Sequence, residues 1–561
     1  MAFADLILTD ARIYTGDAHR PSATALAIAG GTIVAFDADV DAWRGDATRV
    51  RDLAGAFVMP GFIDVHNHHA LAGRGDLFEL SFSPGLGLDD VIERIAAYAR
   101  ALPDGAWVTG GSWGSGLLSD LNSSAVLARL DAASAGHPVM LTDDSHHNRW
   151  VNSAAMAFAD ETDETEAGVG GVVMRDPVDG ALTGVLLESA GIAVAAAAER
   201  VAPLDEAAQR ACSARGIEIL SGFGVTAFQD AAVSLPIMRA LAQLDDTDAL
   251  NAWVVSSMVI NDDIFGFSPV GADLMLRGEE FRREHHRPDF VKIFLDGVPP
   301  ARTGAFLEPY LPDDAHGAHF CGETTIPAEE LYDWLRTAAE RGLSAKVHCT
   351  GDASARALLD AVERLRAEGF SGARFQLAHG QFLADDDLPR LASLDVSADI
   401  SPFLWFPGVI PDAIATALPA DRASRMQPNR SLLDLGANIA GGSDWPVSES
   451  PNPWEGIQGL VTRADPLGRA PGTLWPEQAI TLPEAIAVFT RNAAEAMGLD
   501  DVTGSLEIGK SADLIVLDRD PFEIPVDTLI ETRVRETWFA GRLVHADQST
   551  AAETALTREM Q

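Results

Sequence analysis

The sequence has few cysteines and no long apolar run. Its cysteines are Cys212, Cys321 and Cys349, too few and too scattered for a disulfide framework. This usage is typical of a reducing compartment, and the amino terminus lacks the basic stretch of a secretion signal. The Ala-rich stretch 192–198 is too short to span a bilayer. We therefore expect a cytoplasmic protein.

Positive charge is also scarce. The 83 Asp and Glu residues outnumber the 41 Lys and Arg residues, giving a formal net charge of -42. This charge repels nucleic acid phosphates and anionic membrane surfaces, so we expect neither as a partner. The lysines are Lys292, Lys346 and Lys510. Such scarcity suits a salt-adapted proteome or a GC-rich genome, and the abundance of alanine favours the second.

Two histidines stand at the end of an apolar run. Residues 57–65 lead directly into His66, Asn67 and His68. In an extended strand, residues i and i+2 point to the same side, so the two imidazoles leave the strand together. The two histidines could form half of a metal site. This motif alone leaves open the alternative that they are polar residues at a strand edge.

Other metal-type side chains end or punctuate short apolar runs that are followed by turn signals. They are His348, His379, Asp444 and Lys292. Runs of this kind are typical of strands. Independent strands are thus predicted to deliver polar groups to one rim.

Strand-like and helix-like runs alternate through the middle of the chain. The predicted strands cover residues 62–68, 225–230, 253–260, 290–295, 345–348, 375–379, 396–400 and 439–443. Helical periodicity appears between several of them, as in 328–341 and 353–369. This alternation predicts an α/β fold, a (β/α)8 TIM barrel, whose active site lies at the carboxyl ends of the strands.

Strand-like segments also occur at both ends of the chain. Residues 1–60 and 500–548 are predicted to form one small β-sandwich domain. The barrel takes residues 61–69 and 202–499. The interval 70–201 is too long for a single βα loop, so we predict an inserted lid subdomain there.

The chain resembles the amidohydrolase superfamily, specifically its YtcJ-like branch (amidohydrolase family 3), which contains N-substituted formamide deformylases. The resemblance covers nearly the whole chain. Its motifs occur in this order: PGFIDVHNH at 60–68, HNRWVN at 147–152, VKIFLDG at 291–297, VHCTGD at 347–352, LAHGQ at 377–381, GSDWP at 442–446 and GKSADL at 509–514. Together they are highly specific.

The resemblance implies a site for one or two divalent metal ions, with zinc the expected metal. The implied ligands are His66, His68, Lys292, His348, His379 and Asp444. In this arrangement His66, His68 and Asp444 hold the more buried ion, and the other two histidines hold a second ion or position the substrate. Asn67, Cys349 and Thr350 depart from the commoner family pattern, but no ligand is lost.

The implied reaction is hydrolysis of a non-peptide amide-type carbon–nitrogen bond in a small apolar substrate by metal-bound hydroxide. The predicted catalytic residues are Asp444, Lys292 and His348. Asp444 would carry the proton from water to the leaving nitrogen, although a turn cap is its alternative role. Lys292 could form a carbamate that bridges two ions, or could instead pair with Asp296 or Asp444.

The predicted substrate contacts are His147, Trp150, Trp113 and Asp296. For His147 the alternative is packing within the lid, and for the tryptophans it is the hydrophobic core. A homodimer stays open as an assembly.

A non-catalytic binding module is the alternative from another functional class. Retention of every ligand-type residue favours the hydrolase. A deaminase, an ester hydrolase or an isomerase also stays open, because fold and metal do not define the substrate.

Overall fold

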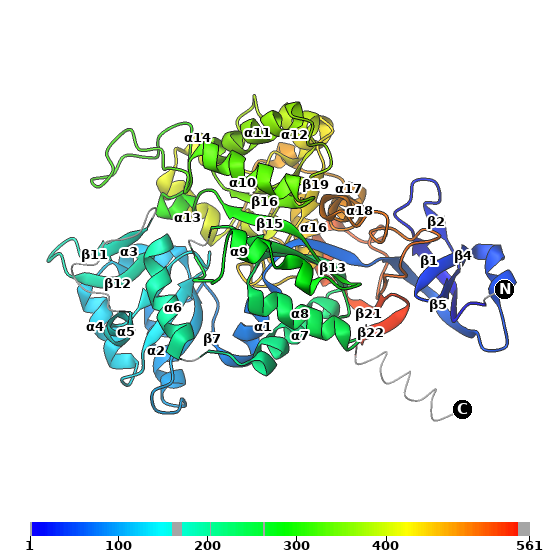
Figure 1. Ribbon diagram of the computed structural model, residues 1–561, viewed down its shortest axis with the longest axis horizontal. Coiled ribbons are helices and arrows are strands. Elements are labelled where there is room, and N and C mark those ends of the chain that lie inside the picture. The colour runs from blue at the N-terminus through cyan, green and yellow to red at the C-terminus, as the bar shows by residue number, and fades with distance from the viewer. Residues whose placement is uncertain (1–2, 160–170, 202, 262–263, 548–561) are drawn as a thin grey trace.

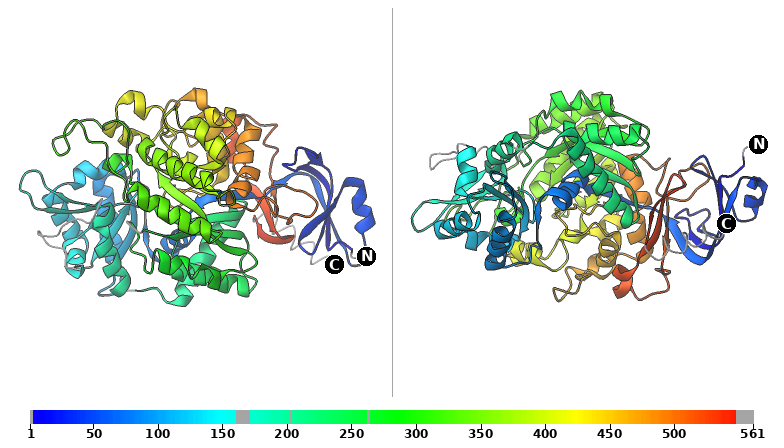
Figure 2. Two further views of the ribbon diagram at one scale, coloured as in Figure 1. Left: turned by 45° about the horizontal axis from the view of Figure 1, so that its top comes forward. Right: turned by 90° about the horizontal axis from the view of Figure 1, so that it is seen from below.

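The computed structural model describes residues 3–159, 171–201, 203–261 and 264–547. A parallel sheet with flanking helices occupies the centre of the molecule (Figure 1). A second sheet lies on one side of it, at the left of Figure 1, and a third sheet built from both ends of the chain lies at the right. Figure 2 shows the same three parts from two other directions.

Within the described residues, eight parallel strands form the central sheet in sequence order. They are β6 (Phe62–Asn67), β13 (Val225–Val233), β14 (Trp253–Val259), β15 (His286–Phe294), β16 (Ser344–Cys349), β17 (Phe375–His379), β18 (Val396–Ile400) and β19 (Ile439–Gly441). Each overlaps one predicted strand, so the barrel prediction is confirmed. The first and last strands meet where Ser443 donates hydrogen bonds to Asp64 from its backbone N, at 3.0 Å, and its Oγ, at 2.6 Å.

Helices cover the outside of this barrel. They include α1 (His69–Phe78), α7 (Glu206–Gly222), α8 (Leu235–Asp246), α10 (Ala328–Glu340), α11 (Asp352–Ala367), α12 (Leu388–Leu394), α15 (Asn429–Asp434), α16 (Pro453–Thr462), α17 (Leu482–Val488) and α18 (Arg491–Met497). Leu331 and Leu335 of α10 are one helical turn apart and share a core with Val347 of β16. The two predicted helices, 328–341 and 353–369, correspond to α10 and α11.

Alternation along the strands separates the barrel's apolar outside from its polar inside. In β16, Val347 and Cys349 pack in the core between strands and helices, whereas His348 lines an internal cavity. In β15, Val291 packs outward in the same way and Lys292 lines the cavity. The strands therefore bring their polar side chains together inside one end of the barrel.

The third sheet combines strands from both ends of the chain, as predicted. It contains β1 (Leu6–Tyr14), β2 (Ser22–Ala23), β3 (Leu26–Ala29), β4 (Thr32–Phe36), β5 (Arg49–Pro60), β20 (Leu514–Leu517), β21 (Val534–Phe539) and β22 (Arg542–Ala546). Leu8, Ile28, Leu514 and Trp538 share one of its hydrophobic clusters. Gly61 links β5 to β6, and a Cβ there would lie 2.2 Å from Thr226 Oγ1, so this close approach requires glycine.

The inserted segment forms a sheet with helices of its own. Its described strands are β7 (Leu80–Ser81), β8 (Val108–Trp113), β9 (Val139–Asp143), β10 (Arg149–Val151), β11 (Val172–Arg175) and β12 (Leu182–Leu187), and its helices are α2 (Leu88–Ala99), α3 (Leu118–Leu121), α4 (Ser124–Ala133), α5 (Ser153–Phe158) and α6 (Ile192–Val201). Ile95, Leu130, Leu141 and Val185 belong to one buried cluster. The inserted subdomain thus has its own core.

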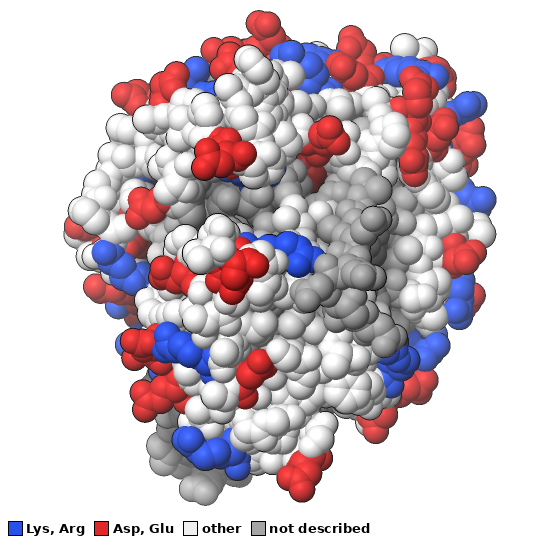
Figure 3. All heavy atoms as spheres, turned by 90° about the vertical axis from the view of Figure 1, so that its left-hand side faces the viewer, with Lys and Arg blue, Asp and Glu red and all other residues white. Residues whose placement is uncertain are grey.

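Three further helices lie in the loops of the barrel. They are α9 (Ala272–Met275), α13 (Val409–Ala417) and α14 (Ala420–Ala423). On the face that carries the inserted subdomain, charged side chains are most numerous around the edge, and a few acidic and basic groups also lie near the middle (Figure 3). None of the described helices combines the length and apolar composition needed to cross a bilayer.

Candidate metal centre

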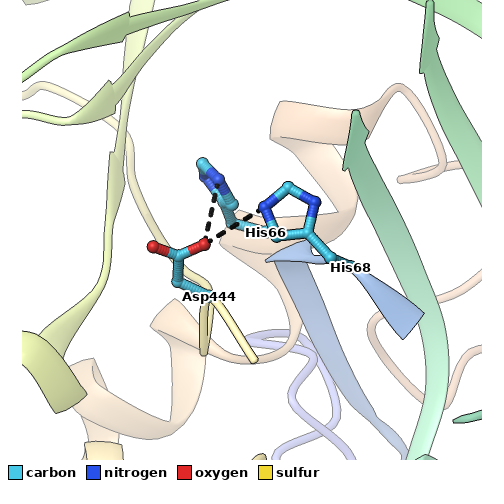
Figure 4. A group of neighbouring side chains, drawn as sticks. All are labelled: His66, His68 and Asp444. Atoms are coloured by element: carbon cyan, nitrogen blue, oxygen red, sulfur yellow. Dashed lines mark ion pairs between the residues drawn. The ribbon is translucent and has the colours of Figure 1, made fainter. Parts of the chain in front are cut away.

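Three predicted ligands meet at the carboxyl end of the barrel strands. His66 Nε2 lies 3.5 Å, and His68 Nε2 3.4 Å, from the same Oδ1 of Asp444 (Figure 4). All three residues are buried, and their potential ligand atoms lie within 4.8 Å of one another. Imidazole nitrogens with a carboxylate oxygen are a donor set that suits zinc and similar divalent ions.

The ring of His66 is oriented as a metal ligand requires. Its Nδ1 lies 2.6 Å from Asp399 Oδ2, so Nε2 is the nitrogen directed toward Asp444. Among the residues that the structure describes, Nε2 has no hydrogen-bond partner, and a bound ion would satisfy it. Burial lowers the pKa of His66 well below its usual value, which leaves the ring neutral with a lone pair available.

The other predicted ligands line the same cavity. It holds about 290 Å³ of empty space, and its wall includes Lys292, His348 and His379 beside the three residues above. The His379 ring centroid lies 4.8 Å from that of His66 and 4.7 Å from that of His348. Burial lowers the pKa values of His348 and His379. The six predicted ligands therefore converge, although the ion that each would hold is still a prediction.

Lys292 is almost completely buried in this cavity, with Nζ 4.7 Å from the centroid of the Phe294 ring. Among the described side chains, no carboxylate lies within ion-pair distance of Lys292, but the charges of Asp444 and Asp399 act to raise its pKa, so pairing with Asp296 or Asp444 stays an alternative. Burial and the charge of Lys346 lower the pKa of Lys292 to about 7. A substantial fraction of the amine is therefore neutral near pH ~7 and able to react as a nucleophile.

The backbone and side chain of Asp444 have different roles. Its φ of 58° lies in the left-handed region that favours glycine, and its backbone carbonyl accepts a hydrogen bond from Val447 N at 2.7 Å. The carboxylate faces His66 and His68 instead. The turn is thus made by the backbone, and the side chain is available for chemistry. His379, with a φ of 71°, is similarly strained.

Sequence reasoning missed the groups that orient these ligands. Asp399 lies between His66 and Lys346, and it forms a buried ion pair with the lysine. Both residues had a signal in the sequence. Lys346 precedes His348 by two positions, so both side chains share one strand face, and Asp399 belongs to the predicted strand 396–400.

His147 comes from the loop between β9 and β10 of the inserted subdomain and reaches the candidate centre. Its ring centroid lies 5.1 Å from that of His348, and its Nδ1 lies 2.7 Å from Glu188 Oε2. Burial acts to lower the pKa of His147, but the carboxylates of Glu188, Asp143 and Asp444 together outweigh it, and the net pKa is raised. Sequence reasoning also missed Glu188.

The remaining predicted substrate contacts lie elsewhere. Trp113 and Trp150 belong to the core of the inserted subdomain, with exposed fractions of 1% and 0%, and neither lines the cavities at the centre. They pack there because an aromatic ring fills a core as well as a pocket. Asp296 accepts a hydrogen bond from Thr350 N at 2.9 Å and lies 3.2 Å from His348 Nδ1. It therefore supports His348, and its predicted contact with a substrate stays a prediction.

The other histidines mostly have separate partners. His69, His285 and His316 pair with nearby aspartates, and His286 lies 2.9 Å from Ser256 Oγ. His146 lines the ligand cavity beside His147.

A second cavity opens next to the ligands and shares six of its lining residues with the first, namely Ser145, His147, His348, His379, Asp444 and Val447. It holds about 450 Å³ of empty space. Its other walls are largely apolar and include Val298, Pro299, Leu404, Trp405, Ile410 and Ile414. Apolar walls beside the histidines have the chemistry that suits a small molecule with an apolar body and one polar group.

Comparisons with known proteins show the family and the fold of the chain. A model of the amidohydrolase family matches residues 49–545. The N-substituted formamide deformylase of Arthrobacter pascens is 28% identical over 96% of this chain and 98% of its own length. The putative amidohydrolase YtcJ of Bacillus subtilis (strain 168) is 27% identical over 88% of this chain and 90% of its own. The crystal structure of an uncharacterized metal-dependent hydrolase from Pyrococcus horikoshii OT3 shares the fold, with a TM-score of 0.72 at 22% identity, covering 93% of this chain and 99% of that one.

Proposed function

Because the chain belongs to the amidohydrolase family, we propose that it is a metal-dependent hydrolase of an amide-type carbon–nitrogen bond, other than a peptide bond, in a small apolar substrate. The observation that carries this proposal is the meeting of His66, His68 and Asp444 beside an apolar cavity. Zinc is the metal that we expect from the donor set.

Each residue at the candidate metal centre can have a different role in hydrolysis. A divalent ion held by His66, His68 and Asp444 would activate a water molecule and polarise the carbonyl oxygen of the substrate. Asp444 would accept a proton from the attacking water and return it to the leaving nitrogen. His147 would contact the scissile group from the inserted subdomain, which we propose acts as a lid that excludes water. The apolar walls would hold the rest of the substrate.

The bond type is tested by a panel of substrates. We expect metal-loaded protein to hydrolyse N-alkyl formamides, acyl amines or cyclic amides at least about 100-fold faster than matching esters, because sites can discriminate strongly by polar contacts. Within the preferred class, each added methylene should improve kcat/KM about fourfold until the apolar cavity is full, since burying a methylene contributes about 0.8 kcal/mol.

The control for this panel is His68→Ala, which removes a ligand and should be inactive toward every substrate. Deamination of heterocycles without amide hydrolysis would replace the proposal with a deaminase. If no member of the panel turned over, the binding-module alternative would be favoured.

A further inference from the structure

We propose that Glu188 is a positioning residue, which holds His147 so that its Nε2 meets the scissile amide group of the substrate. The inference rests on the proposed function of the same site. It assigns a role to a side chain that is neither a predicted ligand nor a predicted substrate contact.

The first support is the contact between the two side chains. His147 Nδ1 lies 2.7 Å from Glu188 Oε2, and the side chains are only 9% and 7% exposed. Since the carboxylate accepts the hydrogen of Nδ1, Nε2 is the ring nitrogen that remains for a substrate. His147 lines both the ligand cavity and the apolar cavity, so its ring lies where the two cavities meet.

The second support is how Glu188 itself is held. Its other oxygen, Oε1, accepts a hydrogen bond from Thr303 Oγ1 at 2.6 Å, and Thr303 Oγ1 accepts one from Val298 N at 2.9 Å. Thr303 belongs to the barrel loop after β15, whereas Glu188 and His147 belong to the inserted subdomain. The chain of contacts therefore orients His147 from both parts of the protein.

Gly297 makes room for these contacts. A Cβ at this position would lie 2.2 Å from Thr303 Oγ1 and 2.3 Å from Glu188 Oε1, closer than atoms can approach. Gly297 is the last residue of the motif VKIFLDG. Its preceding residue, Asp296, lies 3.2 Å from His348 Nδ1. The loop after β15 thus supports the candidate ligand His348 through Asp296. The same loop supports His147 through the contact of Thr303 with Glu188.

The backbone conformation of Glu188 also supports the proposal. Its φ of 51° lies in the left-handed region, which a side chain of this type seldom adopts without compensation. Glu188 N donates a hydrogen bond to Asn148 Oδ1 at 3.3 Å, and Asn148 directly follows His147. Backbone and side chain of Glu188 are therefore both fitted to the His147 loop.

A double-mutant cycle with Glu188→Gln and His147→Ala tests the proposal. If Glu188 acts through His147, each single variant should lower kcat by about 10- to 100-fold, and the double variant should be no worse than His147→Ala alone. Bound metal should be unchanged in all three. Glu199→Gln on α6 is the matched control, because its carboxylate pairs with Arg74 on the exposed surface and should not affect turnover.

Thr303→Val provides a milder second variant if Glu188→Gln folds poorly. It should lower kcat when it is made in the wild-type protein but not when it is added to His147→Ala. Independently of turnover, the Nδ1 proton of His147 should give a downfield NMR resonance that Glu188→Gln shifts and His147→Ala removes. An unshifted resonance, or losses in kcat that simply multiply in the double variant, would overturn the proposal. Failure of the proposed function would look different, since the wild-type protein would then hydrolyse no amide while the resonance remained.

Discussion

Asp444→Asn is expected to lower kcat/KM by at least about 1,000-fold, within the range that loss of a general acid–base produces. The Oδ1 atom of Asp444 lies 3.5 Å from His66 Nε2 and 3.4 Å from His68 Nε2, so the negative charge of its carboxylate lies beside both histidine ligands. Asparagine has the same shape, but it carries no charge and cannot accept a proton. Steady-state kinetics with the preferred amide provides the measurement.

The fold should survive this substitution, because the backbone hydrogen bonds of residue 444 to His66 O and from Val447 N do not involve the carboxylate. Asp385→Asn is a suitable control. Its carboxylate is exposed and pairs with Arg425, and it should leave kcat/KM unchanged. A folded Asp444→Asn variant that kept more than a tenth of wild-type activity would remove Asp444 from the proposed chemistry.

Lys292→Ala is expected to lose activity and one bound metal ion, and a short carboxylic acid or bicarbonate should restore part of both. The reason is that Lys292 is buried beside the ligands with a pKa lowered to about 7, first by burial and then by Lys346. A neutral amine can react with carbon dioxide to form a carbamate. The carbamate is anionic and its oxygens could bind the metal ions, whereas a protonated amine would repel them. Metal analysis and kinetics with and without added acid are the readouts.

Lys292→Arg separates this hypothesis from a simple need for positive charge. A guanidinium stays protonated and forms no carbamate, so this variant should be as inactive as Lys292→Ala. Lys510→Ala is the control, because that lysine pairs with Glu507 in the terminal part of the chain. Full activity in Lys292→Arg would exclude a carbamate.

The barrel could be predicted from the sequence because each strand combines local signals. In 344–349, apolar residues that face the helices alternate with Lys346 and His348, which face the interior. The strand ends then place side chains distant in sequence at one rim, as the fold requires. This is why a list of candidate ligands drawn from separate motifs converges on one cavity.

The contacts of the orienting groups could not be predicted in the same way. The contact of Asp399 with His66 joins positions 333 residues apart, and that of Glu188 with His147 depends on how the inserted subdomain packs. Local pattern also could not separate a tryptophan in a core from one in a pocket. Trp405 lines the apolar cavity, whereas Trp113 packs inside the inserted subdomain.

The metal content of the purified protein tests the central claim most directly. Elemental analysis should find about one to two equivalents of a divalent ion per chain, zinc above all, as the imidazole and carboxylate donors favour. The content should fall in His66→Ala and His68→Ala together with activity, and added metal should restore activity to chelator-treated wild-type protein. Protein that is free of metal and yet fully active would contradict the account.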